Sequence, residues 1–191
     1  MASKLIPKKA RRVFHGVIFD VYQWRQKMFN GAPALFEAAK REDTVQIIAT
    51  TGEKIITLYQ TQPGKGWYYS FPGGRMDVAG ERPRATAIRE LLEETGYKSS
   101  KWLLWKQMSG GGGSKMVHNN YIFLAKDCHK IQNPQPDNGE KIKVRLYSFE
   151  PFLKLTDRAD CQFWPPALKI ELLLARIHPK RKKVLKKTIF G

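Results

Sequence analysis

Residues 72–97 read PGGRMDVAGERPRATAIRELLEETGY, and this stretch predicts a glycine turn followed by one helix. Pro83 suits the first helical position, because its missing N–H would be unpaired there in any case. Gly96 suits the position just past the last turn. Between them, apolar residues recur at helical spacing: Ala87, Ile88, Leu91 and Leu92. The stretch therefore predicts a helix over residues 83–95 with one buried face.

Three glutamates share one edge of this predicted helix. Glu90, Glu93 and Glu94 stand at positions i, i+3 and i+4, where Cβ atoms are about 5–6 Å apart. Like charges at that distance repel each other and raise the pKa of at least one carboxyl group. A hard divalent cation such as Mg²⁺, which prefers carboxylate oxygens, would offset this repulsion. The alternative is a solvated acidic helix face, which runs of charge usually form.

Residues just before the glutamates extend the predicted metal site. Arg89 stands one turn before Glu93 and offsets part of the negative charge, and Glu81 can add a further ligand. The glycines at 73 and 74 let the backbone bend tightly and approach a ligand closely, so that a carbonyl can reach a metal. A cation held in this way can clamp a diphosphate and neutralise the charge that develops on its oxygens.

The same residues resemble the signature of the Nudix hydrolases. That signature is Gly, five residues, Glu, seven residues, then Arg-Glu-apolar-any-Glu-Glu-any-Gly-apolar. Residues 89–97 (RELLEETGY) match its helical part at every fixed position, and Glu81 precedes Arg89 by seven intervening residues. Gly74 and Glu81 are separated by six residues instead of five, and the additional residue falls in a loop, where insertions are tolerated best.

The resemblance implies a role for each residue of the signature. The principal metal ligands would be Glu90 and Glu94, with Glu93 as a ligand or as the group that activates water. The carbonyl of Gly73 and the carboxylate of Glu81 would add to the metal site, and Arg89 would orient the carboxylates. The substrate would contact the following residues: Gly74, Arg75 and Trp24. Trp24 could stack on a nucleobase, although an aromatic residue is more often part of a core or an interface than a platform for a base.

Two further segments resemble ADP-ribose pyrophosphatase-like Nudix hydrolases. Residues 13–60 are similar to their front end, whose strands pair or swap across a homodimer. Residues 137–144 are similar to their late loop, in which a glutamate acts as catalytic base, and Glu140 takes that place here. A carboxylate in such a loop can close over substrate and position water. The alternative for Glu140 is a turn residue exposed to solvent.

The remaining pattern predicts an α+β fold, and the resemblance implies an α/β/α sandwich, with a mixed sheet between helices and an N-terminal strand extension. Runs of β-branched and aromatic residues predict strands, and a second helix is expected over 165–177. The predicted strands are 13–24, 34–39, 44–49, 54–60, 67–71, 102–108, 120–125 and 142–149. The glycine-rich run 109–114 is expected to be a mobile loop. The expected divisions are a basic tail (1–12), a strand region and possible dimerisation element (13–43), a Nudix domain (44–177) and a second basic tail (178–191).

The charge of the chain is concentrated at its ends. The net charge is +17, yet residues 1–12 hold five cations and residues 176–187 hold seven, with no acid in either stretch. Removing these 12 from the 34 Lys and Arg leaves 22 cations against 17 acids, a net charge of about +5. Such ends can make weak contacts with nucleic acid, or can be solvated tails that keep the protein soluble.

Composition limits the classes of protein and the cellular locations to be expected. No apolar run approaches the roughly 20 residues that cross a bilayer, and the two cysteines lack the spacing of a zinc site. A cytoplasmic enzyme without membrane contact is therefore expected. We expect Mg²⁺-dependent hydrolysis of a nucleoside diphosphate derivative of the ADP-ribose or nucleotide-sugar type, with Mn²⁺ as a possible substitute. The alternatives are a nucleoside triphosphate pyrophosphatase and an RNA-associated Nudix protein that uses its basic tails.

Overall fold

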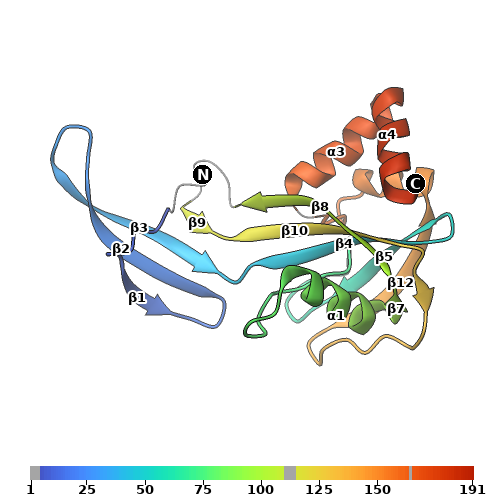
Figure 1. The fold of residues 1–191 in the computed structure, drawn as a ribbon, viewed down its shortest axis with the longest axis horizontal. Helices are drawn as coiled ribbons and strands as arrows, with labels where there is room; N and C mark the ends of the chain where they lie inside the picture. The colour runs from blue at the N-terminus through green and yellow to red at the C-terminus, as the bar shows by residue number, and fades with distance from the viewer. Residues whose placement is uncertain (1–4, 110–114, 164) are drawn as a thin grey trace.

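A six-stranded mixed sheet forms the centre of the computed structural model, which describes residues 5–109, 115–163 and 165–191 (Figure 1). Strand β10 runs parallel to β4, and the other neighbours are antiparallel. In spatial order the strands are β12 (Lys141–Ser148), β5 (Lys54–Thr61), β4 (Thr44–Thr51), β10 (Asn119–Lys126) and β8 (Lys101–Ser109), with β6 (Tyr68–Ser70) paired to β5. The pairing of β10 with β4 joins the two halves of the chain in one sheet.

Helices cover both faces of this sheet (Figure 1). Helix α1 (Pro83–Thr95) buries Ala87 and Leu91 in the core cluster that contains Ile47 of β4. A second cluster on the other face includes Phe152, Leu172 and Leu185. These come from helices α2 (Phe149–Lys154), α3 (Pro166–Ile177) and α4 (Pro179–Phe190), with the 3₁₀ turn η1 (Leu155–Asp157) after α2. The predicted α+β sandwich is therefore confirmed.

Helix α1 begins and ends where the sequence predicted. Pro83 is its first residue, and Gly96 follows its last turn with φ of 74°, a left-handed conformation that favours glycine. The N–H of Gly96 donates to the carbonyl of Leu92 at 2.8 Å, and a side chain at Gly96 would collide with the carbonyl of Gln132. The helix is therefore stopped by a residue that no other type replaces without strain. Next to it, β7 (Tyr97–Lys98) pairs with β11 (His129–Lys130).

The N-terminal region forms a second sheet that projects from the main one (Figure 1). Its strands, in spatial order, are β1 (Arg11–His15), β2 (Phe19–Lys27), β3 (Pro33–Arg41) and β9 (Met116–Val117). The prediction of a single strand over residues 13–24 was wrong, because the chain turns at Gly16, whose N–H donates to the carbonyl of Phe19 at 2.9 Å. The same hairpin takes Arg11 and Arg12, which the sequence had assigned to a basic tail.

The basic C-terminal stretch is a helix and not a solvated tail. Helix α4 spans Pro179–Phe190 and buries Leu185 and Ile189. Two apolar residues four positions apart face the domain, while the cations between them face outward. The prediction of a tail over 178–191 was wrong because six cations masked this short apolar stripe. The glycine run at 110–114 lies outside the described residues, and within the described parts no helix is long and apolar enough to span a membrane.

Candidate active site

The glycine turn before α1 lies directly against strand β4. The N–H of Ile47 donates to the carbonyl of Pro72 at 2.8 Å, and the N–H of Val45 donates to the carbonyl of Gly74 at 2.9 Å. Gly73 between them has φ of 151°, and a Cβ there would collide with the carbonyl of Val45. A glycine is required at this position because any side chain would push the turn off the strand.

Glu94 of α1 is buried under this turn. The residue is only 4% exposed, and its carboxylate accepts a hydrogen bond from the N–H of Gly73 at 2.7 Å. Burial raises the pKa of Glu94 well above its ordinary value, and the Gly73 bond lowers it only in part, while the charge of Glu90 raises it further. A carboxylate so placed needs either a proton or a cation.

Glu90 lies beside Glu94, against the second glycine of the turn. A Cβ on Gly74 would overlap the Glu90 carboxylate, so the carboxylate occupies the space that the glycine leaves open. The Glu90 side chain is 14% exposed. Burial raises its pKa to about 7, the charge of Arg89 lowers it, and the charge of Glu93 raises it. The turn and the helix therefore bring two desolvated carboxylates together at two glycines.

Arg89 forms salt bridges with three carboxylates of the signature. Its guanidinium nitrogens lie 3.3 Å from Glu81, 2.9 Å from Glu90 and 3.0 Å from Glu93. The hydroxyl of Thr86 donates to Glu81 at 2.8 Å and helps to fix the position of that carboxylate. Arg89 is thus placed to orient three carboxylates. The sequence interpretation missed Thr86, whose role depends on the helix bringing it alongside the loop that carries Glu81.

The groups present fit a divalent cation held mainly by Glu90 and Glu94. Among the described residues, no three His, Cys, Asp or Glu side chains already surround one point. Mg²⁺ typically keeps several waters and uses only one or two protein carboxylates together with substrate phosphates. Within the same part of the chain, the carbonyl of Gly73 accepts no hydrogen bond, whereas those of Pro72 and Gly74 are used by β4. Two acidic groups and one free carbonyl therefore remain for an ion.

Glu140 approaches the cluster from the loop before β12. Its carboxylate accepts a hydrogen bond from the side-chain amide of Gln62 at 2.8 Å, and its N–H donates to the carbonyl of Asp137 at 2.9 Å. The charge of Glu140 contributes to the raised pKa of both Glu90 and Glu94. The fold thus places this loop carboxylate near the helix. Gln62, which holds it, was not foreseen from the sequence.

The predicted substrate contacts fall in two different places. Arg75 continues the glycine turn, lies 3.6 Å from Asp77 and lines a cavity of about 430 Å³ together with Gly74. Trp24 lies in the projecting sheet, where its ring packs on Phe36 at a centroid distance of 5.7 Å and its indole N–H donates to Gln26 at 3.1 Å. These contacts of Trp24 all lie within the extension.

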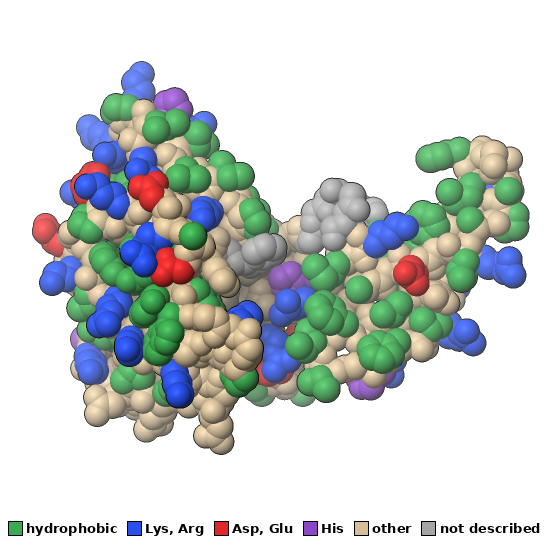
Figure 2. Space-filling model, turned by 180° about the vertical axis from the view of Figure 1, so that it is seen from behind, with side chains coloured by type: hydrophobic (Ala, Val, Ile, Leu, Met, Phe, Trp, Pro, Cys, Tyr) green, Lys and Arg blue, Asp and Glu red, His purple; other side chains and the backbone are tan. Residues whose placement is uncertain are grey.

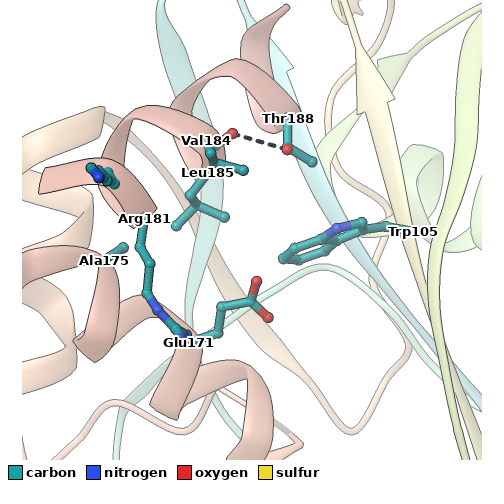
Figure 3. Close-up of a pocket in the computed structure, with 8 residues that line it drawn as sticks. Trp105, Glu171, Ala175, Arg181, Val184, Leu185 and Thr188 are labelled. Atoms are coloured by element: carbon teal, nitrogen blue, oxygen red, sulfur yellow. Dashed lines mark hydrogen bonds between the residues drawn. The ribbon is translucent and has the colours of Figure 1, made fainter. Parts of the chain in front are cut away.

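Another cavity lies on the opposite face of the main sheet, between β8 and the pair α3 and α4 (Figure 3). It measures about 280 Å³, and Trp105, Glu171 and Arg181 line it. Thr188 also lines it and donates to the carbonyl of Val184 at 2.9 Å. None of the signature residues borders this cavity, so the chemistry of the carboxylate cluster belongs to the α1 face.

Comparison with known proteins agrees with the geometry of this face. The family model described as NUDIX domain matches residues 40–163, and the chain belongs to the Nudix family. It is therefore a Nudix hydrolase. Within the family it is ADP-ribose pyrophosphatase-like: it is 30% identical over 178 residues to the ADP-ribose pyrophosphatase of Bacillus subtilis, covering 91% of this chain and 93% of that protein.

Other relatives carry different names. The methanol dehydrogenase activator of Bacillus methanolicus is 30% identical over 129 residues, covering 65% of this chain and 68% of that protein. A solved structure described as an ADP compounds hydrolase superimposes with a TM-score of 0.70 at 21% identity, covering 88% of this chain and 90% of that one. This last likeness concerns the fold.

Proposed function

We propose that the protein hydrolyses the diphosphate of ADP-ribose or of a related nucleotide sugar in a reaction that depends on Mg²⁺. The products are a nucleoside monophosphate and a sugar phosphate. One observation carries the proposal: Glu94 and Glu90 are desolvated carboxylates packed against the Gly73–Gly74 turn. The similarity to the ADP-ribose pyrophosphatase of Bacillus subtilis supports the choice of substrate.

The proposed roles follow from where each group lies. Mg²⁺ would be held by Glu90, Glu94 and the carbonyl of Gly73, with Glu81 and Glu93 nearby, and would neutralise charge on the phosphoryl oxygens; Mn²⁺ can substitute. Arg89 orients the carboxylates around it. Glu140 takes a proton from the attacking water, and Gln62 holds it in place for this task. The diphosphate contacts Arg75 and the backbone of Gly74.

A substrate panel tests this proposal. The purified full chain is incubated with Mg²⁺ and ADP-ribose, a nucleoside diphosphate hexose or ATP, and products are separated by ion-exchange chromatography. The proposal expects AMP and ribose 5-phosphate from ADP-ribose and slow or no reaction with ATP. Release of inorganic pyrophosphate from ATP at a higher kcat/KM would instead identify a nucleoside triphosphate pyrophosphatase.

We also propose that two copies associate through the projecting sheet. Large apolar side chains are exposed along it, and Figure 2 shows them gathered on its surface. The main ones are Phe14, Val17, Phe29 and Leu35. Unpartnered apolar surface of this kind marks an interaction site. Light scattering after size exclusion should give a dimer for the native chain and a monomer for Leu35→Asp.

A second candidate function, RNA association, is favoured by one feature of α4. Five of its cations are exposed, namely Lys180, Arg181, Lys183, Lys186 and Lys187, and Trp105 lines the neighbouring cavity. Exposed cations beside an aromatic ring suit single-stranded nucleic acid. Fluorescence anisotropy with a labelled RNA at increasing salt tests this, since phosphate contacts weaken steeply with salt. An unchanged signal after neutralising these cations would rule the candidate out.

A further inference from the structure

The cavity on the β3–β4 side of the glycine turn has a lining unlike that of the carboxylate cluster. Its volume is about 430 Å³. The polar side chains that line it are Arg41, Thr44, Gln46, Arg75 and His118. Gly74 borders it as well, and the Glu90 carboxylate packs against Gly74 without lining the cavity. A molecule in this cavity would therefore reach the carboxylates across a single residue. Figure 2 shows basic and histidine side chains at this junction of the two sheets.

Two side chains in the cavity have buried polar atoms without partners. Within the described residues, Nε of Arg41 and Oε1 of Gln46 are buried and make no hydrogen bond. Buried groups left unpaired are costly, so nearly all such atoms in folded proteins find a partner. Gln60 and Asn120 also leave one oxygen unpaired, but each uses its amide nitrogen, toward Ser70 and Thr44 respectively. The side chains of Arg41 and Gln46 have no hydrogen bond in that same part of the chain.

The two orphan atoms have complementary chemistry. Arg41 offers a charged donor, and Gln46 offers a neutral acceptor. Arg75 adds a second guanidinium to the lining of the cavity. His118 is held by the hydroxyl of Thr44 at 3.0 Å. Burial and the charge of Arg41 lower its pKa, and the charge of Asp43 raises it only in part, so the neutral imidazole is favoured. The cavity therefore favours a ligand with an anionic group and hydroxyl donors.

We propose that this cavity binds the sugar-phosphate half of the substrate, with Arg41 donating to phosphoryl oxygens and Gln46 accepting from a sugar hydroxyl. The inference rests on the proposed function and deepens it, because it names the part of the nucleotide sugar that this cavity recognises. It assigns specificity to residues outside the Nudix signature. The scissile diphosphate would then lie over Gly74, between the two guanidiniums and the carboxylates.

Direct binding of ribose 5-phosphate to the full chain in the presence of Mg²⁺, measured by isothermal titration calorimetry, tests the inference. The variants are Arg41→Met and Gln46→Leu, and Lys40→Met, an exposed neighbour on β3, is the matched control. Because hydrogen bonds from charged groups are the stronger ones, Arg41→Met should weaken binding about 10- to 100-fold and Gln46→Leu about 3- to 10-fold. Lys40→Met should bind like the native chain.

Thermal unfolding separates this role from a structural one. If Gln46 awaits a ligand, Gln46→Leu removes an unpaired buried acceptor, so its unfolding midpoint should equal or exceed that of the native chain while binding falls. In the nucleotide-sugar assay the same variants should raise KM and leave kcat within about twofold.

The outcomes distinguish this inference from the proposed function. Ribose 5-phosphate binding that Arg41→Met and Gln46→Leu weaken supports the subsite even if no substrate in the panel turns over. Hydrolysis of ADP-ribose with unchanged KM in both variants overturns the subsite and leaves the proposed function standing. The inference also fails if native protein and both variants bind ribose 5-phosphate equally.

Discussion

Helices α1 and α4 lie on opposite faces of one sheet and carry charge of opposite sign (Figure 1). The acids of α1 each have a partner: the Glu94 carboxylate accepts a hydrogen bond from the N–H of Gly73, and Arg89 forms salt bridges with Glu90 and Glu93. The cations of α4 mostly face solvent, and Lys182 pairs with Glu150 at 3.0 Å. Both helices also bury an apolar stripe in the core.

The difference lies in desolvation and not in the number of charges. A charge that faces water interacts weakly with its neighbours, whereas a buried carboxylate must be compensated. On α1 the backbone of a glycine turn enforces that burial, and this is why we propose a metal site there. On α4 most cations face water, so this helix presents a solvated basic surface and packs on the domain through Leu185 and Ile189. The following predictions, from the largest expected effect to the smallest, test this contrast.

Replacing the buried acid of α1 should have the largest effect. We expect Glu94→Gln to lower kcat/KM for ADP-ribose at least about 100-fold, since a catalytic metal contributes several kcal/mol and about 1.4 kcal/mol is a factor of ten. Arg84→Gln, an exposed change on the same helix, should leave the rate within about twofold. Steady-state assays at saturating Mg²⁺ measure both, and equal rates for the two variants would contradict the assignment.

Shortening the buried stripe of α4 should reduce stability without touching the chemistry. Leu185 is 4% exposed, so Leu185→Ala should lower the free energy of unfolding by about 2–5 kcal/mol. Val184→Ala, at a residue 65% exposed, should cost less than about 0.5 kcal/mol. Urea unfolding followed by circular dichroism gives both values. A similar small loss at the two positions would mean that α4 is not packed as described.

Without metal, stability should depend on pH through Glu90, whose pKa burial raises from 4.5 to about 7. The folded chain then binds this proton more tightly than the unfolded chain does. The contribution of Glu90 therefore becomes less favourable as pH rises from 4.5 to 7, by about 3 kcal/mol at most. In EDTA, the unfolding free energy of Glu90→Gln should therefore rise relative to that of the native protein by up to this amount between pH 5 and pH 8. Parallel pH profiles of the two proteins in urea unfolding would contradict the burial of this carboxylate.

A methyl group at the glycine turn should displace the carboxylate that it touches. In Gly74→Ala the added Cβ overlaps Glu90, so we expect kcat to fall about 10- to 100-fold, as small misplacements at an active site do. Gly66→Ala, where nothing lies within 4 Å of the new Cβ, is the matched control and should keep its activity. The idea that Gly74 makes room for Glu90 fails if both variants are fully active.

The smallest effect is expected on the surface of α4. Lys183→Gln combined with Lys187→Gln should change unfolding free energy by no more than about 0.5 kcal/mol, because both side chains are exposed. Hydrolysis of ADP-ribose should be unchanged. A rate loss comparable to that of Glu94→Gln would show that the two helices are not as different as we describe.

The sequence predicted local features best at positions where the backbone conformation favours one residue type. Pro83 and Gly96 mark the ends of α1, and runs of β-branched and aromatic residues located most strands of the main sheet. Helix α4 was missed because the evidence for it is long-range: Leu185 is identified as core only once the sheet beneath it exists. The turn at Gly16 is local, since Gly16 contacts Phe19 only three residues later, and it was missed because β-branched and aromatic residues on both sides of it read as one continuous strand.

The same limit applies to the site. Spacing along one helix brings Glu90, Glu93 and Glu94 together, so a sequence can predict them. Arg41 lies on β3, Gln46 on β4 and His118 between β9 and β10, so the three meet only when these strands pack together. Single isolated polar residues in strands give no signal of their own. The cavity was identified because, within the described residues, one buried atom of Arg41 and one of Gln46 have no hydrogen-bond partner.

Manganese binding followed by electron paramagnetic resonance tests the central claim most directly, because the signal of free Mn²⁺ falls as the ion binds. We predict saturable loss of that signal with native protein, a strongly reduced loss with Glu94→Gln, and a native curve with Arg84→Gln. Native protein that leaves the Mn²⁺ signal unchanged, or a Glu94→Gln curve that overlays the native one, would contradict a cation site at the buried carboxylates of α1.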